Sequence, residues 1–267
     1  MAVEKEIEYE IGNSINVGRK RAGKPNQDSM AVLMPRANGS VPPILIVADG
    51  MGGYAGGATA SQIIIQRFNT LYTGFQGNEF SMQPFASQVI NESLSEMQQK
   101  GAQDTQLANM GSTLVAVSLE NGKVSIANVG DSRAYLFHAG EIIQLSYDHS
   151  FIGEAMRAGL LTPVQAMNHP KKNQLTQSIS ARRYEVKPYF ADHPKAKDDI
   201  VVLCSDGLWG VVPEAVIQAI VIELSPQQAA EKLVKMANSR GGPDNISVIV
   251  ARQKDAIPLN PFSYMAD

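Results

Sequence analysis

The chain has 267 residues, of which 44% are hydrophobic and 18% are charged, and its formal net charge is −3. A chain of this length and composition can bury the core of one large domain. With 26 acidic against 23 basic residues, no overall positive charge attracts a phosphate backbone, and we expect no nucleic-acid partner. No stretch approaches the roughly 18 apolar residues of a membrane span, and the first residues show no basic segment leading into an apolar stretch. We therefore expect a cytoplasmic protein, with its single cysteine, Cys204, buried and inert.

The predicted elements begin with a short apolar strand at 44–48. Two helices follow, at 60–71 and 89–97, where apolar residues recur every three or four positions. The middle of the chain has the alternation and tight turns of an antiparallel meander. Its four strands are expected at 114–119, 124–129, 134–138 and 142–145.

The last third alternates strands at 200–204 and 246–250 with helices at 217–224 and 230–237. Two helix starts, at Ser225-Pro226 and at Thr162-Pro163, each have a glutamine three residues after the N-cap residue, which is the pattern of a capping box. Strands interrupted by helix pairs favour an α+β fold with two packed antiparallel β-sheets, flanked by helix pairs on both sides. We expect one domain over 1–254 and a tail over 255–267.

Four aspartates occupy the same kind of position, at the end of an apolar strand and beside a residue that forms turns. They are Asp49, Asp131, Asp206 and Asp244. Any one of them alone is more typical of a turn than of a ligand, because aspartate side chains bond to their own backbone in turns. Together, four carboxylates at one rim would repel one another, and bound cations would offset that repulsion. Oxygen ligands select hard ions such as Mg²⁺ or Mn²⁺ and argue against zinc.

Seven blocks of the sequence, taken in order, resemble the metal-dependent type 2C serine/threonine protein phosphatases of the bacterial type. The resemblance extends from about Asn16 to Ala251. The blocks are Pro25-Asn26-Gln27-Asp28-Ser29, Val47-Ala48-Asp49-Gly50-Met51-Gly52-Gly53, Gly111-Ser112-Thr113, Val129-Gly130-Asp131-Ser132-Arg133, Asp148-His149-Ser150, Cys204-Ser205-Asp206-Gly207-Leu208-Trp209 and Gly242-Pro243-Asp244-Asn245. Each block is weak evidence by itself, whereas the ordered set is specific.

The resemblance implies hydrolysis of phosphoserine and phosphothreonine in proteins by a water that bridges two Mn²⁺ or Mg²⁺ ions, without a phosphoenzyme. By motif match, the ions would be held by Asp49, the carbonyl of Gly50, Asp206 and Asp244. Asp28 would act through metal-bound water, and Asp131 with Asp206 would hold a third, weaker ion. The partners implied are phosphorylated proteins, with a cognate serine/threonine kinase among them, and we expect a monomer that binds no membrane.

Two positions depart from the family pattern. Many relatives have a histidine, the proposed general acid, where this chain has Met51; His149 could replace it, although a structural role in its turn is favoured. The family places a phosphate-binding arginine where this chain has Gly23. Arg21 is the preferred substitute and Lys24 the second, because a guanidinium binds phosphate oxygens bidentately.

Three further points stay open from the sequence alone. The resemblance implies that the segment at about 148–180 forms a flap beside the site that touches the protein substrate, and a plain surface excursion is the alternative. The two departures raise the alternative of a catalytically silent module of the same fold that binds phosphoproteins. The glycines at 50–57 could also cradle a nucleotide phosphate, but the segment lacks the Lys-Ser/Thr ending of a P-loop.

Overall fold

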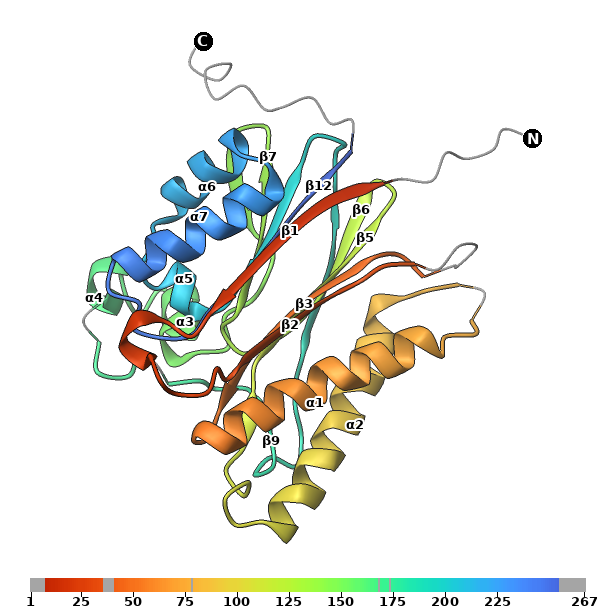
Figure 1. Ribbon diagram of the computed structural model, residues 1–267, viewed down its shortest axis with the longest axis vertical. Helices are drawn as coiled ribbons and strands as arrows, with labels where there is room; N and C mark the ends of the chain where they lie inside the picture. Colours follow the sequence, from red (N-terminus) through yellow and green to blue (C-terminus); the bar gives the residue numbers. More distant parts are fainter. Residues whose placement is uncertain (1–7, 36–40, 78, 168, 173, 255–267) are drawn as a thin grey trace.

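The computed structural model describes residues 8–35, 41–77, 79–167, 169–172 and 174–254. The tail expected at 255–267 lies outside these residues. Two antiparallel β-sheets pack face to face, with helices on the outer face of each sheet (Figure 1). The predicted α+β sandwich is therefore confirmed. Within the described residues, no helix combines the length and the apolar character required to cross a bilayer.

The first sheet has the strand order β1-β12-β11-β7-β8, and all of its neighbours are antiparallel. Its strands are β1 (Tyr9–Asn16), β7 (Arg133–His138), β8 (Glu141–Gln144), β11 (Ile200–Cys204) and β12 (Ile246–Gln253). The two central strands, β11 and β12, are almost continuous runs of β-branched and other apolar residues, as expected for strands that are covered on both faces. Ala139 and Gly140, both with positive φ, close the β7–β8 hairpin.

The second sheet has the order β10-β6-β5-β3-β4-β9, and β2 also pairs with β3. Its strands are β2 (Asp28–Leu33), β3 (Ile44–Met51), β4 (Gly111–Ser112), β5 (Leu114–Glu120), β6 (Lys123–Val129), β9 (Ile179–Ser180) and β10 (Tyr189–Pro194). The predicted turn at Asn121-Gly122 joins β5 to β6. Leu45, Val117 and Ile126 of this sheet meet Leu203 and Ile249 of the first sheet in a buried layer between the two.

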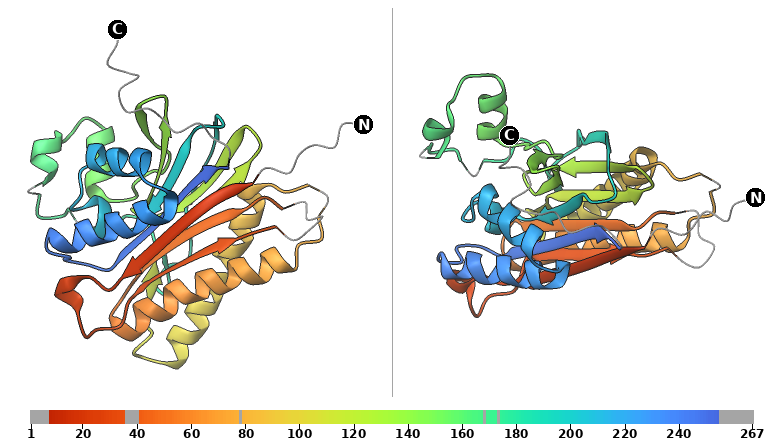
Figure 2. Two further views of the ribbon diagram at one scale, coloured as in Figure 1. Left: turned by 45° about the horizontal axis from the view of Figure 1, so that its top comes forward. Right: turned by 90° about the horizontal axis from the view of Figure 1, so that it is seen from above.

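Two long helices cover the second sheet and two shorter ones cover the first (Figure 2). The first pair is α1 (Tyr54–Thr73) and α2 (Met82–Gln103), and the second is α6 (Glu214–Glu223) and α7 (Pro226–Ser239). Shorter elements surround one end of the sandwich: the 3-10 turn η1 (Arg19–Arg21), α3 (Phe151–Arg157), α4 (Pro163–Met167) and α5 (Asp206–Trp209). All four helices expected in the two flanking pairs are present.

Three long strands have no counterpart in the sequence prediction: β1, β2 and β10. Each has several half-exposed residues and lacks a continuous apolar run. In β1, Gly12 interrupts the pattern because a side chain there would lie 2.1 Å from the backbone nitrogen of Gln227 on α7. Packing against distant parts of the chain therefore determines that these segments form strands, and local sequence periodicity does not reveal that packing.

Two local details also differ from expectation. The first helix is expected at 60–71 from its apolar periodicity, but α1 begins earlier, at Tyr54. The capping box forms at Thr162, whose N–H donates to Gln165 Oε1 (2.9 Å) and whose Oγ1 accepts from Gln165 N (3.3 Å). At Ser225 the hydroxyl donates to Gln228 Oε1 (3.0 Å) and makes no hydrogen bond to the helix backbone.

The buried layer between the two sheets contributes strongly to the stability of the fold. Leu203 is fully buried there, so Leu203→Ala is expected to lower the free energy of unfolding by about 2–5 kcal/mol through lost burial and the cavity left behind. Leu160→Ala removes the same atoms from a side chain that is 75% exposed, and it is expected to change the free energy of unfolding by less than about 0.5 kcal/mol. Urea unfolding of the two variants measures the difference, and equal losses would contradict this account of the core.

Candidate active site

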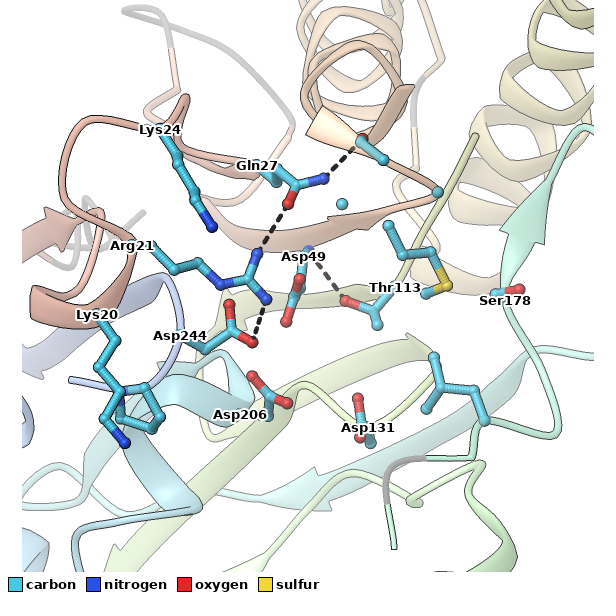
Figure 3. Close-up of a pocket in the computed structure, with 16 residues that line it drawn as sticks. Lys20, Arg21, Lys24, Gln27, Asp49, Thr113, Asp131, Ser178, Asp206 and Asp244 are labelled. Carbon is cyan, nitrogen blue, oxygen red and sulfur yellow. Dashed lines mark hydrogen bonds and ion pairs between the residues drawn. The ribbon is translucent and has the colours of Figure 1, made fainter. Parts of the chain in front are cut away.

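A cavity of about 760 Å³ opens at one end of the sandwich, where strands of both sheets end. The carboxyl groups of four aspartates line it, and Figure 3 shows them converging on one space from four segments of the chain. These are the four aspartates expected from the sequence: Asp49, Asp131, Asp206 and Asp244. The fold thus gathers groups that are up to 195 residues apart (from 49 to 244) around one opening.

Asp49 lies inside β3 and not in a turn after the strand, which corrects the sequence expectation. It pairs with Asp28 across the β2–β3 ladder. Its backbone N–H donates to Thr113 Oγ1 (3.0 Å), and its carbonyl accepts from Thr113 N (2.9 Å). A regular ladder therefore fixes the position of this carboxylate.

The other three aspartates follow or precede strands. Asp131 comes after β6 and follows Gly130, whose φ of 96° would be strained for any residue with a side chain. Asp206 is the first residue of α5 and comes shortly after β11, and Asp244 sits just before β12 with its Oδ1 accepting from Asn245 N (2.7 Å). All three positions depend on strand ends that lie at the same rim.

Asp28 lies beneath the cavity and is only 5% exposed. Its Oδ2 accepts hydrogen bonds from Ser205 Oγ (2.7 Å) and Ser247 Oγ (2.8 Å), which belong to segments beside β11 and on β12. Among the described residues, its Oδ1 has no hydrogen-bond partner. Asp28 therefore joins the two sheets through one oxygen and leaves the other available.

Burial and like charge shift these carboxyl groups away from their ordinary pKa. Burial raises the pKa of Asp49 well above its usual value, and the charges of Asp28 and Asp206 raise it further. The pKa of Asp206 is raised well above its usual value, first by burial and then by Asp131. Burial raises the pKa of Asp28 and of Asp131 to about 6. The cluster is a site of unfavourable negative charge that a cation would relieve.

Two observations indicate that the residues suit a hard cation. All donors are oxygens, and Asp206 Oδ1 is a second buried oxygen without a hydrogen-bond partner among the described residues. In the described part of the chain, no three acidic, histidine or cysteine side chains already stand as a ready ligand group. Arg21 contacts the cluster as well, since its Nη2 lies 2.7 Å from Asp244 Oδ2.

Arg21 brings positive charge to the same wall. It lies on η1, and its Nη1 donates to Gln27 Oε1 (2.9 Å) while Nη2 pairs with Asp244. Lys24 and Lys20 also line the cavity, although Lys20 points away from the carboxylates in Figure 3. Both basic residues chosen from the sequence therefore lie at the cavity, and Arg21 contacts the aspartate cluster through Asp244.

The glycine-rich segment allows close approach of backbone at the cavity floor. A side chain at Gly50 would lie 2.0 Å from the carbonyl oxygen of Gly57, so only glycine fits. Gly50 N donates to Gln27 O (3.1 Å), and this bond ties the end of β3 to the residue before Asp28. Gly52 and Gly53 follow with φ of 101° and 93° and open α1. These glycines shape the turn that leads into α1.

His149 does not line the cavity, whereas Met51 does. His149 is 7% exposed, its Nδ1 accepts from Gly130 N (3.2 Å), and burial lowers its pKa. It therefore has the structural role that the sequence favoured. From the segment at 148–180, Leu175 and Ser178 reach the cavity wall. Sequence reasoning did not single out these two residues, since no spacing signals them.

Sequence reasoning also passed over Gln27 and Thr113 as individual site residues, although both stand in the matching blocks. Their signal was their position: each is adjacent to or paired with an aspartate of the cluster. Thr113 Oγ1 also lies 2.7 Å from Ser132 Oγ, so it links β3 to the turn that carries Asp131.

Comparison with known proteins agrees with the fold. The chain is 35% identical over 240 residues to the serine/threonine phosphatase stp of Listeria innocua, which covers 88% of this chain and 93% of that protein. A crystal structure of the Mycobacterium tuberculosis serine/threonine phosphatase PstP/Ppp superposes with a TM-score of 0.80 and 28% identity, over 92% of this chain and 99% of that one. The catalytic domain of PstP in complex with two manganese ions gives a TM-score of 0.79 and 27% identity, over 94% of this chain and all of that one.

The family model for protein phosphatase 2C matches residues 17–239, which is most of the chain. The matched region includes β2, β3, β6 and β11, and with them three of the four aspartates at the cavity. The relatives are bacterial, as the motifs predicted. The chain is therefore a protein phosphatase and belongs to the protein phosphatase 2C family.

Proposed function

We propose that this phosphatase hydrolyses phosphoserine and phosphothreonine in other proteins, with divalent metal, without a phosphoenzyme. The observation that carries the proposal is the convergence of four carboxyl groups and a guanidinium on one open cavity. Acidic side chains alone would repel a phosphate, whereas a cavity that binds cations and also offers an arginine suits a phosphate monoester. The proposed catalytic domain spans 1–254, and the segment at 148–180 forms its flap.

The residues that would hold two Mn²⁺ or Mg²⁺ ions are Asp49, the carbonyl of Gly50, Asp206 and Asp244. Asp131 with Asp206 would hold a third ion more weakly, and Asp28 would act through metal-bound water. When bound, the ions supply a water of lowered pKa as nucleophile and offset charge on the phosphoryl oxygens. The manganese-bound PstP structure supports this choice of metal for a relative of the same fold.

The remaining chemistry belongs to the protein itself. Arg21 offers a guanidinium at the cavity wall that can hold two phosphoryl oxygens and orient the ester. Lys24 adds a second positive charge at the same wall. Leu175 and Ser178 border the cavity from the flap, so a protein substrate would touch this segment as its phosphorylated side chain enters.

Removing one central carboxylate tests the site. Asp206→Asn is expected to lower manganese-dependent hydrolysis of p-nitrophenyl phosphate and of a phosphothreonine peptide by at least about 100-fold, because an amide binds a cation far more weakly. Asp192→Asn, at an exposed aspartate on β10, is the matched control and is expected to keep its activity. Full activity in excess chelator would contradict the proposal, and absence of both turnover and manganese binding in the unmodified chain would favour the silent module.

The raised pKa of Asp131 predicts a pH-dependent stability in the metal-free protein. Between pH about 4 and pH about 6 the folded state keeps a proton that the unfolded state has lost, so this group makes stability fall as the pH rises. Asp131→Asn removes that loss. We therefore subtract the unfolding free energy of the unmodified protein from that of the variant at each pH. This difference is expected to rise by up to about 3 kcal/mol from pH 4 to pH 7. Urea unfolding in chelator at several pH values measures it, and a flat or falling difference would contradict the assignment.

The role of Arg21 is testable through phosphate itself. Arg21→Gln is expected to raise both the KM for p-nitrophenyl phosphate and the inhibition constant of inorganic phosphate about 10-fold, because a bidentate charged contact is lost. Lys24→Gln is expected to raise them less, and Lys20→Gln hardly at all, because Lys20 points away from the carboxylates (Figure 3). Equal effects of all three substitutions would indicate a general charge effect and not a specific phosphate contact.

A further inference from the structure

Gln27, the residue directly before Asp28, is 5% exposed and uses every polar group it has. Its backbone N–H donates to Asn245 Oδ1 (2.8 Å), and its carbonyl accepts from Gly50 N (3.1 Å) and Ser61 Oγ (2.6 Å). Three distant segments therefore meet at its backbone. These backbone bonds do not depend on the identity of the side chain, so they can be separated from the role of the amide.

The side-chain amide connects two parts of the cavity wall. Its Oε1 accepts from Arg21 Nη1 (2.9 Å), and its Nε2 donates to the carbonyl of Gly53 (2.8 Å), as the dashed lines in Figure 3 mark. Turning the amide over would set a donor against a donor and an acceptor against an acceptor, so only one orientation satisfies both neighbours. Both neighbours of the amide line the cavity.

The structure leaves room for this amide by means of a glycine. A side chain at Gly57 would lie 2.1 Å from Gln27 Nε2. The first turn of α1 is thus shaped around the amide, and the glycine turn that opens the helix is tied to it. The amide belongs to the construction of the site and is not an incidental surface contact.

Arg21 needs a partner of this kind. It lies on a short turn between Gly18 and Gly23, which both have positive φ, and its side chain is 30% exposed. A long, half-exposed side chain loses rotamer freedom when it is held in one place. Its second contact, Asp244, is a proposed metal ligand, and a carboxylate oxygen given to an ion is not available to a guanidinium. Gln27 is the neutral partner that does not compete for metal.

We propose that Gln27 is a positioning residue for phosphate binding: its amide holds the guanidinium of Arg21 against the Gly53 turn, so that a phosphate meets a donor already in place. The inference rests on the proposed role of Arg21 in binding phosphate. It adds a residue that acts through Arg21 and touches neither substrate nor metal. Preorganisation of this kind strengthens binding by removing the cost of ordering the side chain.

Gln27→Met tests it, because methionine has a similar length and can neither accept from Arg21 nor donate to Gly53. The KM for p-nitrophenyl phosphate and the inhibition constant of inorganic phosphate are expected to rise together, about 3- to 10-fold. The kcat and the affinity for Mn²⁺ measured by calorimetry are expected to stay within about twofold. Calorimetric titration of the manganese-loaded protein with inorganic phosphate gives a second readout that does not depend on turnover.

Ser61→Ala is the matched control. It removes a hydrogen bond to the backbone carbonyl of Gln27 at a fully buried site and leaves the side-chain amide in place. It is expected to lower stability without changing the inhibition constant of phosphate. If Gln27→Met does not fold, Gln27→Asn serves the same purpose, because the shorter amide cannot reach both Arg21 and Gly53.

A double-mutant cycle with Arg21→Gln decides the result. If Gln27 acts through Arg21, Gln27→Met is expected to have almost no further effect on phosphate binding when Arg21 is already replaced. An undiminished effect in that background, or no effect of Gln27→Met alone while Arg21→Gln weakens binding, would overturn the inference and leave the role of Arg21 intact. No effect of Arg21→Gln itself would refute both.

Discussion

The mutual repulsion of buried carboxyl groups is the constraint on which this structure depends. Asp49 and Asp206 are half-buried at the cavity. The charges of Asp28 and Asp206 raise the pKa of Asp49, and the charge of Asp131 raises that of Asp206, because the groups lie close together where water screens them poorly. No folding chain gains stability from such an arrangement by itself. The surrounding frame must hold the groups in place, and a cation must compensate for their charge when the site is in use.

The frame meets this demand by placing the carboxylates on its stiffest parts. Asp49 belongs to the ladder of a central strand, and Asp206 begins a helical turn directly beyond another. Behind them, the layer between the sheets is packed with fully buried aliphatic side chains such as Leu45 and Leu203. A stiff core of this kind prevents the rim from relaxing outward under the repulsion. Asp28 adds a direct link, since its Oδ2 binds hydroxyl groups from Ser205 and Ser247 of the opposite sheet.

Much of the fold and of the aspartate cluster could be predicted from the sequence. The central strands and the four flanking helices have strong apolar periodicity, and the aspartates stand beside residues that form turns, so both were predicted. Edge strands such as β1 and β10 were not, because their packing partners lie far away in the chain. The same limit applies within the site: the matching blocks indicate Asp49 and Asp206, but only the structure shows that Gln27 connects Arg21 to Gly53.

The arginine illustrates why spacing alone is an incomplete guide. At the family position the chain has Gly23, whose φ of 82° and open surroundings suit a turn. The 3-10 turn before it, stabilised by the bond from Lys20 N to Gly242 O (2.9 Å), carries Arg21 back to the cavity. A two-residue displacement in sequence is thus absorbed by a local change of backbone, and a guanidinium still reaches the carboxylates.

The side chains at the cavity also bear on which group could protonate a leaving alkoxide. Met51 stands at the cavity and has no proton to donate, and among the described residues that line the cavity there is no histidine. His149 cannot substitute for it: burial lowers its pKa and so favours the neutral ring, whose Nδ1 is already occupied by the N–H of Gly130. Moving His149 into the cavity would break that bond and open the turn that sets Asp131. Among the described residues, the cavity thus offers carboxyl and basic side chains but no imidazole to a bound phosphate ester.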